Sequence, residues 1–279
     1  MPAWQRQLLC IRLRLKEVSK MQYTRFIALG DSMTEGMTDE VVDGKYRGWA
    51  DRVADVIAKT DPSFTYMNLA IRGKLLKQVV EDQIPHALKY IKGKETLVSF
   101  HAGANDVLRP NYIPAISFAE YEKGVKQLTD AGATVMLFTV VDKVDGKGKT
   151  AQLWHERFSN FNENVRMISK KYPAILFEAK KAEFLNDRRF LAFDRLHMNP
   201  EGHRRLANAV LEGLDYEFDP NWRTPLPAAK KKNKLISIGT NIAWIAIFLL
   251  PWIWRRLRGK SSGDGRSAKH HEPISWLAR

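Results

Sequence analysis

Short apolar runs alternate with longer amphipathic stretches through residues 21–215. Five of the runs are rich in β-branched or aromatic residues and have the length of buried strands; they cover residues 25–29, 65–69, 96–101, 134–140 and 174–177. The stretches between them repeat apolar residues at helical spacing, which predicts helices over residues 49–59, 75–90, 118–131, 153–171 and 201–214. Pro85 interrupts the second helix and predicts a kink or a break there.

This alternation predicts an α/β layer fold built on a mostly parallel sheet. In such a sheet, the residues that bind ligands and do chemistry gather outside the carboxyl ends of the strands. The segments that directly follow each predicted strand are therefore the first place to look for a functional site.

Polar residues that could take part in catalysis occur in four segments. Gly30-Asp31-Ser32 follows the first strand, residues 68–73 follow the second, residues 103–106 follow the third, and residues 194–197 open the last helix. Serine, glycine, asparagine and histidine thus occur in order at sites that one topology would bring together.

These residue types together indicate nucleophilic acyl transfer. A serine hydroxyl becomes a good nucleophile only when a base takes its proton, and His197 can be that base for Ser32. Asp194, three residues earlier, can hold the imidazole in the required tautomer. The backbone N–H groups of Ser32 and Gly73 and the side-chain amide of Asn105 are suitable donors for an oxyanion.

Each of these pieces is weak when it is taken alone. An Asp-x-x-His pair is expected by chance roughly 0.4 times in a chain of this composition. Gly-Asp-Ser is more often a turn, Gly73 alone is a loop glycine, and Asn105-Asp106 fits a turn or a helix cap. The order of all four pieces at strand ends favours the catalytic interpretation.

These four segments together resemble the motifs of the SGNH, or GDSL-type, serine hydrolases. The segment 26–36 resembles the first block of that family, with Ser32 in the nucleophile position. Residues 68–73 match the second block, although Ala70 stands where glycine is common. Residues 103–106 and 194–197 match the third and last blocks, and the resemblance covers about residues 23–214.

The resemblance implies a three-layer α/β/α sandwich, flavodoxin-like, with a five-stranded parallel sheet. It also implies a Ser32–His197–Asp194 triad, an oxyanion hole of Ser32, Gly73 and Asn105, and no metal or cofactor. The expected activity is that of a serine esterase or lipase acting on carboxylic esters through an acyl-enzyme. A membrane-associated acyltransferase and a catalytically silent tethered scaffold remain as alternatives.

The formal charge of +14 is concentrated at the two ends of the chain. Residues 1–20 carry a net +4, residues 230–279 carry +9, and residues 21–229 carry only +1. A nearly neutral body argues against nucleic acid as a partner, so the expected partner is a small-molecule or lipid ester; the oligomeric state stays open. The single cysteine, Cys10, excludes an internal disulfide framework and a multi-cysteine zinc site.

Three regions follow from this distribution: a basic extension over 1–20, a hydrolase domain over 21–215, and a basic extension over 216–279 with an apolar helix at 235–254. The first extension is interpreted as dispensable or as a mis-assigned start before Met21. We expect a cytoplasmic enzyme, with membrane association through the apolar helix as an open question.

The C-terminal extension allows two interpretations. Residues 235–254 contain no charge and just reach the length of a membrane span, yet an apolar helix docked on the catalytic domain fits equally. Residues 219–227 and 251–265 resemble the end of a bacterial subset of the same family. The sequence beyond Gly259 predicts a flexible end with solvated histidines. Substrate choice is expected to depend on the loops 37–48, 108–117 and 141–152.

Overall fold

The computed structural model describes residues 22–142, 148–229 and 234–278. Its main sheet has six strands in the order β7-β6-β5-β1-β4-β8. The first five are parallel to one another, and β8 runs antiparallel to β4 at the edge. Their bounds are β1 Arg25–Gly30, β4 Thr65–Asn68, β5 Thr96–His101, β6 Thr134–Phe138, β7 Ala174–Phe177 and β8 His270–Ser275. A small hairpin pairs β2 Val41–Val42 with β3 Lys45–Tyr46.

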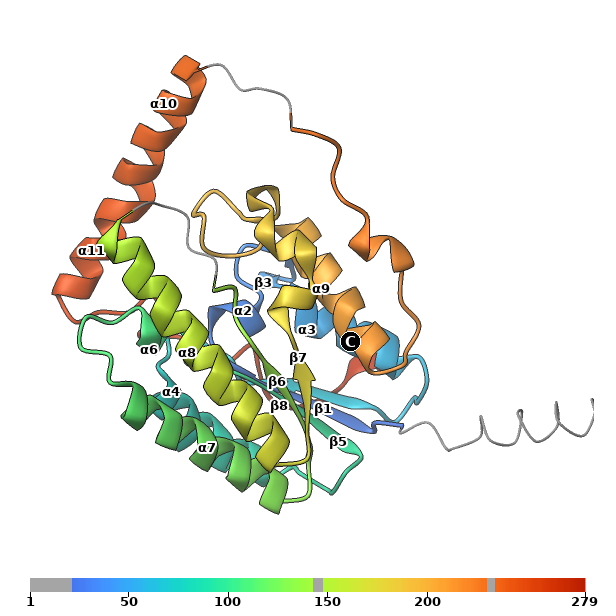
Figure 1. Cartoon of the computed structure of the whole chain (residues 1–279). Helices are drawn as coiled ribbons and strands as arrows, with labels where there is room; N and C mark the ends of the chain where they lie inside the picture. Colours follow the sequence, from blue (N-terminus) through green and yellow to red (C-terminus); the bar gives the residue numbers. More distant parts are fainter. Residues whose placement is uncertain (1–21, 143–147, 230–233, 279) are drawn as a thin grey trace, which may run out of the picture.

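Helices cover both faces of this sheet (Figure 1). One face carries α3 (Gly48–Ala58) and α9 (Pro200–Gly213), which pack against each other. The other face carries α7 and α8 and the run from α4 to α5; the bounds are α4 Leu76–Gln78, α5 Ile84–Leu88, α7 Pro114–Asp130 and α8 Lys149–Lys171. The three-layer α/β/α sandwich predicted from the sequence is therefore confirmed.

Each face of the sheet buries its own apolar core, because side chains alternate between the faces along every strand. In β1, Phe26 and Ala28 pack with α3 and α9, whereas Ile27 and Leu29 pack with the opposite helices. All four side chains are fully buried. Burial on both faces explains why the strands are continuous apolar runs.

The predicted strands and helices agree closely with the structure, and the differences lie at their ends. The helix expected at 153–171 begins at Lys149, and the strand expected at 134–140 ends at Phe138. The helix expected at 118–131 begins earlier, at Pro114, because proline fits the first helical turn where no intrahelical N–H bond is needed. Pro85 does not break its helix. A π-helical segment, Val79–Gln83, precedes it, and Pro85 lies in the first turn of α5.

The prediction of a flexible end beyond Gly259 was wrong. His270–Ser275 forms β8 on the edge of β4, which adds a sixth strand to the expected five. Trp276 follows it and is 2% exposed. Its ring centre lies 4.6 Å from that of Tyr66 in an edge-to-face arrangement, and its Nε1 donates to Asp55 at 2.8 Å. His270 also packs on the Tyr66 ring. This segment has no apolar periodicity of its own, so only its partners reveal that it is a strand.

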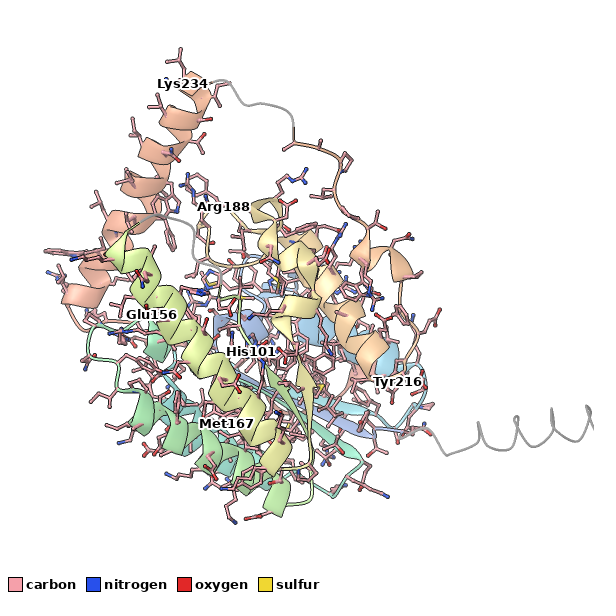
Figure 2. The ribbon with its side chains drawn as sticks, viewed as in Figure 1. His101, Glu156, Met167, Arg188, Tyr216 and Lys234 are labelled. Carbon is pink, nitrogen blue, oxygen red and sulfur yellow. The ribbon has the colours of Figure 1, made fainter. Side chains whose placement is uncertain are left out.

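The apolar helix expected at 235–254 is present as α10 (Lys234–Trp244), a π-helical segment (Ile245–Leu249) and α11 (Leu250–Leu257). Lys234–Arg255 is long and apolar enough to cross a membrane by length and composition. Figures 1 and 2 show the beginning of α10, at Lys234, standing away from the body of the protein, whereas Trp244 at its end bonds to the Asp194 carbonyl at 3.0 Å. The N-terminal extension and residues 143–147 of the loop 141–152 lie outside the described residues. What the sequence predicts for them stays a prediction, as do the domain boundaries.

Candidate active site

Ser32 lies where β1 turns sharply into a short helix. Gly30 has a φ of +143°, and a Cβ there would come within 2.2 Å of the His101 carbonyl oxygen, so only glycine fits. Asp31 caps α2 (Ser32–Glu35) by accepting a hydrogen bond from the Met33 N–H. The turn places Ser32 at the carboxyl edge of the sheet, as the sequence predicts.

Ser32, His197 and Asp194 form a continuous hydrogen-bonded chain. The Ser32 Oγ lies 2.8 Å from His197 Nε2, and His197 Nδ1 lies 2.7 Å from Asp194 Oδ2. The three residues are 6–8% exposed. The segment 194–197 was expected to open the last helix; it instead lies in the loop that precedes α9.

The loop holds Asp194 in a defined orientation. Its Oδ1 accepts the backbone N–H groups of Leu196 and His197, each at 3.0 Å, and its backbone carbonyl accepts the Trp244 Nε1–H at 3.0 Å. Burial would raise the pKa of Asp194, but the hydrogen bonds and the charge of His197 outweigh burial and hold the pKa below its ordinary value. Asp194 therefore stays ionised beside the His197 ring.

The three predicted oxyanion donors meet in one place. Ser32, Gly73 and Asn105 line a small cavity of about 70 Å³ together with His197. Gly73 has a φ of +75°, which suits glycine. The Asn105 amide donates to Asp31 Oδ2 at 3.0 Å and to the Lys74 carbonyl at 3.1 Å. To donate to an oxyanion, it would have to give up one of these two hydrogen bonds.

Sequence reasoning missed three titratable neighbours of the site. Burial raises the pKa of Asp31 to about 6, against the opposing hydrogen bond from Met33, and burial likewise raises the pKa of Asp106 to about 6. Burial lowers the pKa of His101 to about 4. All three residues end or follow β1 and β5, so the strand-end rule that found Ser32 could have found them.

Two arginines, Arg72 and Arg109, lie near the strand ends in the sequence. Arg72 is structural, because its guanidinium is paired with the Glu35 carboxylate and its backbone N–H donates to the same carboxylate at 2.6 Å. The backbone carbonyl of Arg109 accepts a hydrogen bond from Arg157 at 2.9 Å. Neither arginine is among the residues that line the cavities around Ser32.

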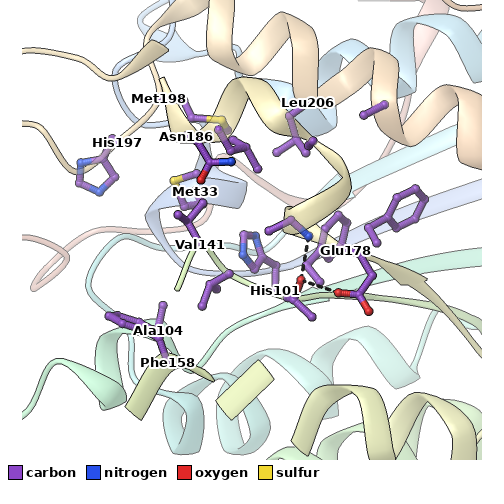
Figure 3. Close-up of a pocket in the computed structure, with 18 of the residues that line it drawn as sticks. Met33, His101, Ala104, Val141, Phe158, Glu178, Asn186, His197, Met198 and Leu206 are labelled. Atoms are coloured by element: carbon purple, nitrogen blue, oxygen red, sulfur yellow. Dashed lines mark hydrogen bonds between the residues drawn. The ribbon is translucent and has the colours of Figure 1, made fainter. Parts of the chain in front are cut away.

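A second, much larger cavity opens from the same catalytic group (Figure 3). Its volume is about 890 Å³, and Ser32 and His197 lie in its wall. From there it passes the ends of β5, β6 and β7 and continues along one side of α9. Figure 3 shows His101, Val141, Phe158 and Leu206 among the side chains that line it. The lining is mostly apolar.

The C-terminal segment also reaches the site, which the sequence did not predict. Arg255, Lys260, Ser261 and Ser262 line the small cavity opposite Ser32. The Ser261 Oγ lies 2.0 Å from where a Cβ on Gly73 would stand, so the segment packs directly on the oxyanion side. Within the sequence, only the resemblance of residues 251–265 to a family tail pointed at this stretch.

Among the described residues, one group of side chains lies close enough together to bind a metal ion. His86, His271 and Glu272 each offer a ligand atom, and these atoms lie within 4.8 Å of one another. His86 Nε2 already bonds to the His271 carbonyl at 2.9 Å, and Glu272 to the Tyr90 hydroxyl. None of the three lines either cavity at Ser32. The buried His203 bonds to the Met37 carbonyl at 3.1 Å and packs as part of α9.

Comparison with known families decides the classification. Residues 28–205 match the model of the GDSL-like lipase/acylhydrolase family. The chain belongs to this family. The matched region includes Ser32, Gly73, Asn105, Asp194 and His197, and membership makes the protein an ester-hydrolysing enzyme by family.

Solved structures with this fold support the architecture. An acetylxylan esterase, Axe2, from Geobacillus stearothermophilus is 17% identical with a TM-score of 0.58, over 72% of this chain and 99% of that one. The psychrotrophic esterase EstA from Pseudoalteromonas sp. is 16% identical with a TM-score of 0.54, over 69% and 97%. LAE5, from a lake metagenome, is 18% identical with a TM-score of 0.55, over 71% and 98%. The search of curated proteins found no match.

Proposed function

We propose that this GDSL-like enzyme is a serine carboxylesterase with Ser32 as nucleophile, His197 as base and Asp194 as the residue that positions His197. The observation that carries the proposal is the hydrogen-bonded chain from Ser32 Oγ through His197 to Asp194, at 2.8 and 2.7 Å. Its order and distances are those that proton removal from a serine requires. The match to an acylhydrolase family supports the same chemistry.

The reaction follows from the positions of these atoms. As the Ser32 oxygen forms a bond to the ester carbonyl carbon, its proton passes to His197 Nε2. Collapse of the tetrahedral intermediate breaks the carbon–oxygen bond to the alcohol, which leaves with the proton from His197. Water, deprotonated by His197, then attacks the acyl-Ser32 and releases the carboxylic acid.

The negative oxygen of the tetrahedral intermediate is assigned to the small cavity. Ser32, Gly73 and Asn105 all line this space. The proposed donors are the backbone N–H groups of Ser32 and Gly73 and the side-chain amide of Asn105. Such donors stabilise the transition state by about 2.7–4 kcal/mol each. In this proposal the Asn105 amide turns from the Lys74 carbonyl to the oxyanion.

A fluorophosphonate probe tests the assignment directly, because it labels only an activated serine. We expect labelling of the wild-type chain at Ser32, identified by peptide mass spectrometry, and none in His197→Ala. The exposed Ser63 supplies the internal control, since it bonds only to Asp61. An unlabelled wild-type chain, or labelling that survives in His197→Ala, would refute the proposed mechanism.

We also propose that the outer side of α10–α11 lies on a membrane surface. Its isoleucines point to solvent, with Ile236, Ile242 and Ile247 62–68% exposed, and an apolar face of this size is unusual on a soluble surface. Lysines and arginines flank the helix at both ends and suit an anionic leaflet. Trp244 and Asn241 contact the catalytic loop, which favours a helix lying along the interface.

Vesicle flotation tests this contact. We expect the chain to float with phosphatidylglycerol vesicles and to remain unbound when Ile242→Asp and Ile247→Asp are combined. Ile116→Asp is the matched control, since Ile116 is 60% exposed on α7, away from this helix. Equal flotation of the double variant and the control would rule out the proposed surface.

A further inference from the structure

Three side chains outside the catalytic site meet where β8 passes α5. His86 lies on α5, and His271 and Glu272 are neighbours on β8. His86 and His271 are 185 positions apart in the sequence, yet His86 Nε2 lies 2.9 Å from the His271 carbonyl oxygen. The centres of the two imidazole rings are 4.0 Å apart. The three side chains therefore connect the C-terminal strand to the body of the protein.

A bulge in β8 explains how two consecutive residues can face the same histidine. In a regular strand, neighbouring side chains point to opposite faces of the sheet. Here the register of β8 on β4 shifts, so that β8 has three residues, 271–273, where β4 has only Met67 between two paired positions. Bulges redirect side chains and often occur beside functional sites. This one brings His271 and Glu272 to the same histidine of α5.

The spacing of the ligand atoms fits one zinc ion. Glu272 Oε1 lies 3.3 Å from His271 Nδ1 and 3.6 Å from His86 Nε2. Nitrogen and oxygen ligands that lie about 2.0–2.2 Å from a tetrahedral zinc ion are about 3.3–3.5 Å from one another. All three residues offer a ligand atom within 4.8 Å of the other two. Both separations that involve Glu272 are therefore close to those of a zinc site.

The Tyr90 hydroxyl orients the carboxylate of Glu272. It donates a hydrogen bond to Oε2, which leaves Oε1 directed at both histidines. Carboxylates that bind metal ions are commonly held by such a hydrogen bond from a neighbouring side chain. Within the described part of the chain, no lysine or arginine forms an ion pair with Glu272. Its negative charge is therefore available to a metal cation.

We propose that His86, His271 and Glu272 bind a zinc ion, with water as the fourth ligand. Two imidazoles and one carboxylate form a donor set that suits zinc, whereas magnesium and calcium prefer oxygen ligands. On binding, His86 gives up its hydrogen bond to the His271 carbonyl and ligates the ion.

The ion has a structural role in this proposal. None of its three ligands lines either cavity at Ser32, so zinc takes no part in ester hydrolysis. It fastens β8 to α5 and thereby holds the C-terminal segment, of which Ser261 and Ser262 line the small cavity. The proposal does not depend on the esterase activity.

Calorimetric titration with zinc chloride tests the site on the full chain, purified without a polyhistidine tag. We expect one zinc ion per chain, and at least tenfold weaker binding in His271→Gln and in Glu272→Gln. His155→Gln is the matched control, because His155 is also exposed but lies on α8. It should bind zinc as wild type does. Magnesium chloride should give no binding signal.

Two further variants distinguish this site from other zinc-binding positions. Tyr90→Phe keeps all three ligands but loses the hydrogen bond to Glu272, and should weaken zinc binding by about tenfold. His197→Ala removes the catalytic histidine and should keep the wild-type affinity. Absence of zinc binding to wild type, an affinity that is unchanged in His271→Gln and Glu272→Gln, or loss of binding in His197→Ala would each overturn the proposal.

Hydrogen–deuterium exchange tests the effect of the ion on β8. Zinc should slow exchange of the β8 amides in wild type about tenfold or more, because opening of the strand then requires loss of the ion. At a zinc concentration about 100 times the Kd, the unfolding midpoint should rise by about 5 °C or more. Glu272→Gln should show neither effect. Zinc binding that leaves β8 exchange unchanged would overturn the structural role.

Discussion

The strand-end loops and the C-terminal segment, residues 255–276, both line the space around Ser32. They are held in place in different ways. The loops after β1 and before α9 hold their own shape through short-range bonds, such as the Asp31 cap and the Asp194 bonds to Leu196 and His197. The C-terminal segment is positioned from a distance, by pairing of β8 with β4 and burial of Trp276.

This contrast separates residues that the sheet itself positions from residues that distant contacts position. The loops are placed by the parallel sheet itself, which any chain of this fold must form, so they suit the reacting groups. The C-terminal segment depends on contacts between residues some 200 positions apart, such as Lys269 with Asp51 at 2.8 Å. Its position at the wall of the small cavity is therefore set by contacts with distant residues and not by the ends of the strands.

The largest effect is expected from the loops. Ser32→Ala removes the nucleophile and should lower kcat for p-nitrophenyl acetate by about 10⁴-fold or more, while the unfolding midpoint stays near that of wild type. Ser63→Ala, at an exposed turn, is the control. Activity within tenfold of wild type would show that another residue attacks the ester.

The second-largest effect is expected in the C-terminal segment. Trp276→Ala removes a buried ring and its bond to Asp55, and should cost about 3–5 kcal/mol of unfolding free energy in urea denaturation. Trp254→Ala, at a ring that is 57% exposed, should change stability by less than 1 kcal/mol. Equal losses in the two variants would mean that β8 does not anchor the C-terminal segment.

A third prediction concerns the pH dependence of stability at the strand ends. Because the pKa of His101 is about 4 in the folded chain and 6.5 as the ordinary value, the unfolded chain binds its proton first. His101 therefore contributes stability above pH 6.5 that is lost as the pH falls toward 4, by about 3 kcal/mol at most. His101→Gln should flatten this part of the profile.

Denaturant unfolding at each pH gives the free energy of unfolding of wild type and of His101→Gln. The prediction concerns the difference between these two free energies. Asp31 and Asp106, with pKa values of about 6, act in the opposite direction, since their contribution is lost as the pH rises from 3.8 to 6. Both residues are present in both chains and largely cancel in the difference. Parallel profiles for wild type and His101→Gln would contradict the prediction.

The smallest effect is expected where the two regions touch. Trp244→Phe keeps an aromatic ring over Arg195 but loses the bond from Nε1 to the Asp194 carbonyl. One hydrogen bond of about 0.5–1.5 kcal/mol predicts a two- to tenfold loss of kcat/KM. Trp254→Phe serves as the control, and an equal loss in both would show that the contact does not help to position Asp194.

Much of the fold could be predicted because its signals are local. Five strands were recognisable as apolar runs. Ser32, Gly73 and Asn105 were recognisable as residues that follow strands, and His197 as a residue close to the start of the last helix of the domain. Their meeting followed from the parallel topology alone. The catalytic roles themselves remain proposals for the labelling and substitution experiments.

The remaining features could not be predicted because they depend on partners far away in the chain. His270–Ser275 carries histidines, a glutamate and a proline and has no strand pattern, yet it pairs with β4. The pKa of Asp31 depends on burial under residues that the sequence does not place beside it. The large cavity arises between β7 and α9, whose spacing is set by packing and not by either segment.

The sequence by itself determined the sandwich, the family and the candidate catalytic residues, because strand periodicity and motif order are properties of neighbouring residues. Only the tertiary structure decided that the C-terminal extension is part of the sheet and of the active-site wall. It also decided that two cavities of about 890 and 70 Å³ meet at Ser32, because the shape of a cavity depends on many contacts between residues that are far apart in the sequence.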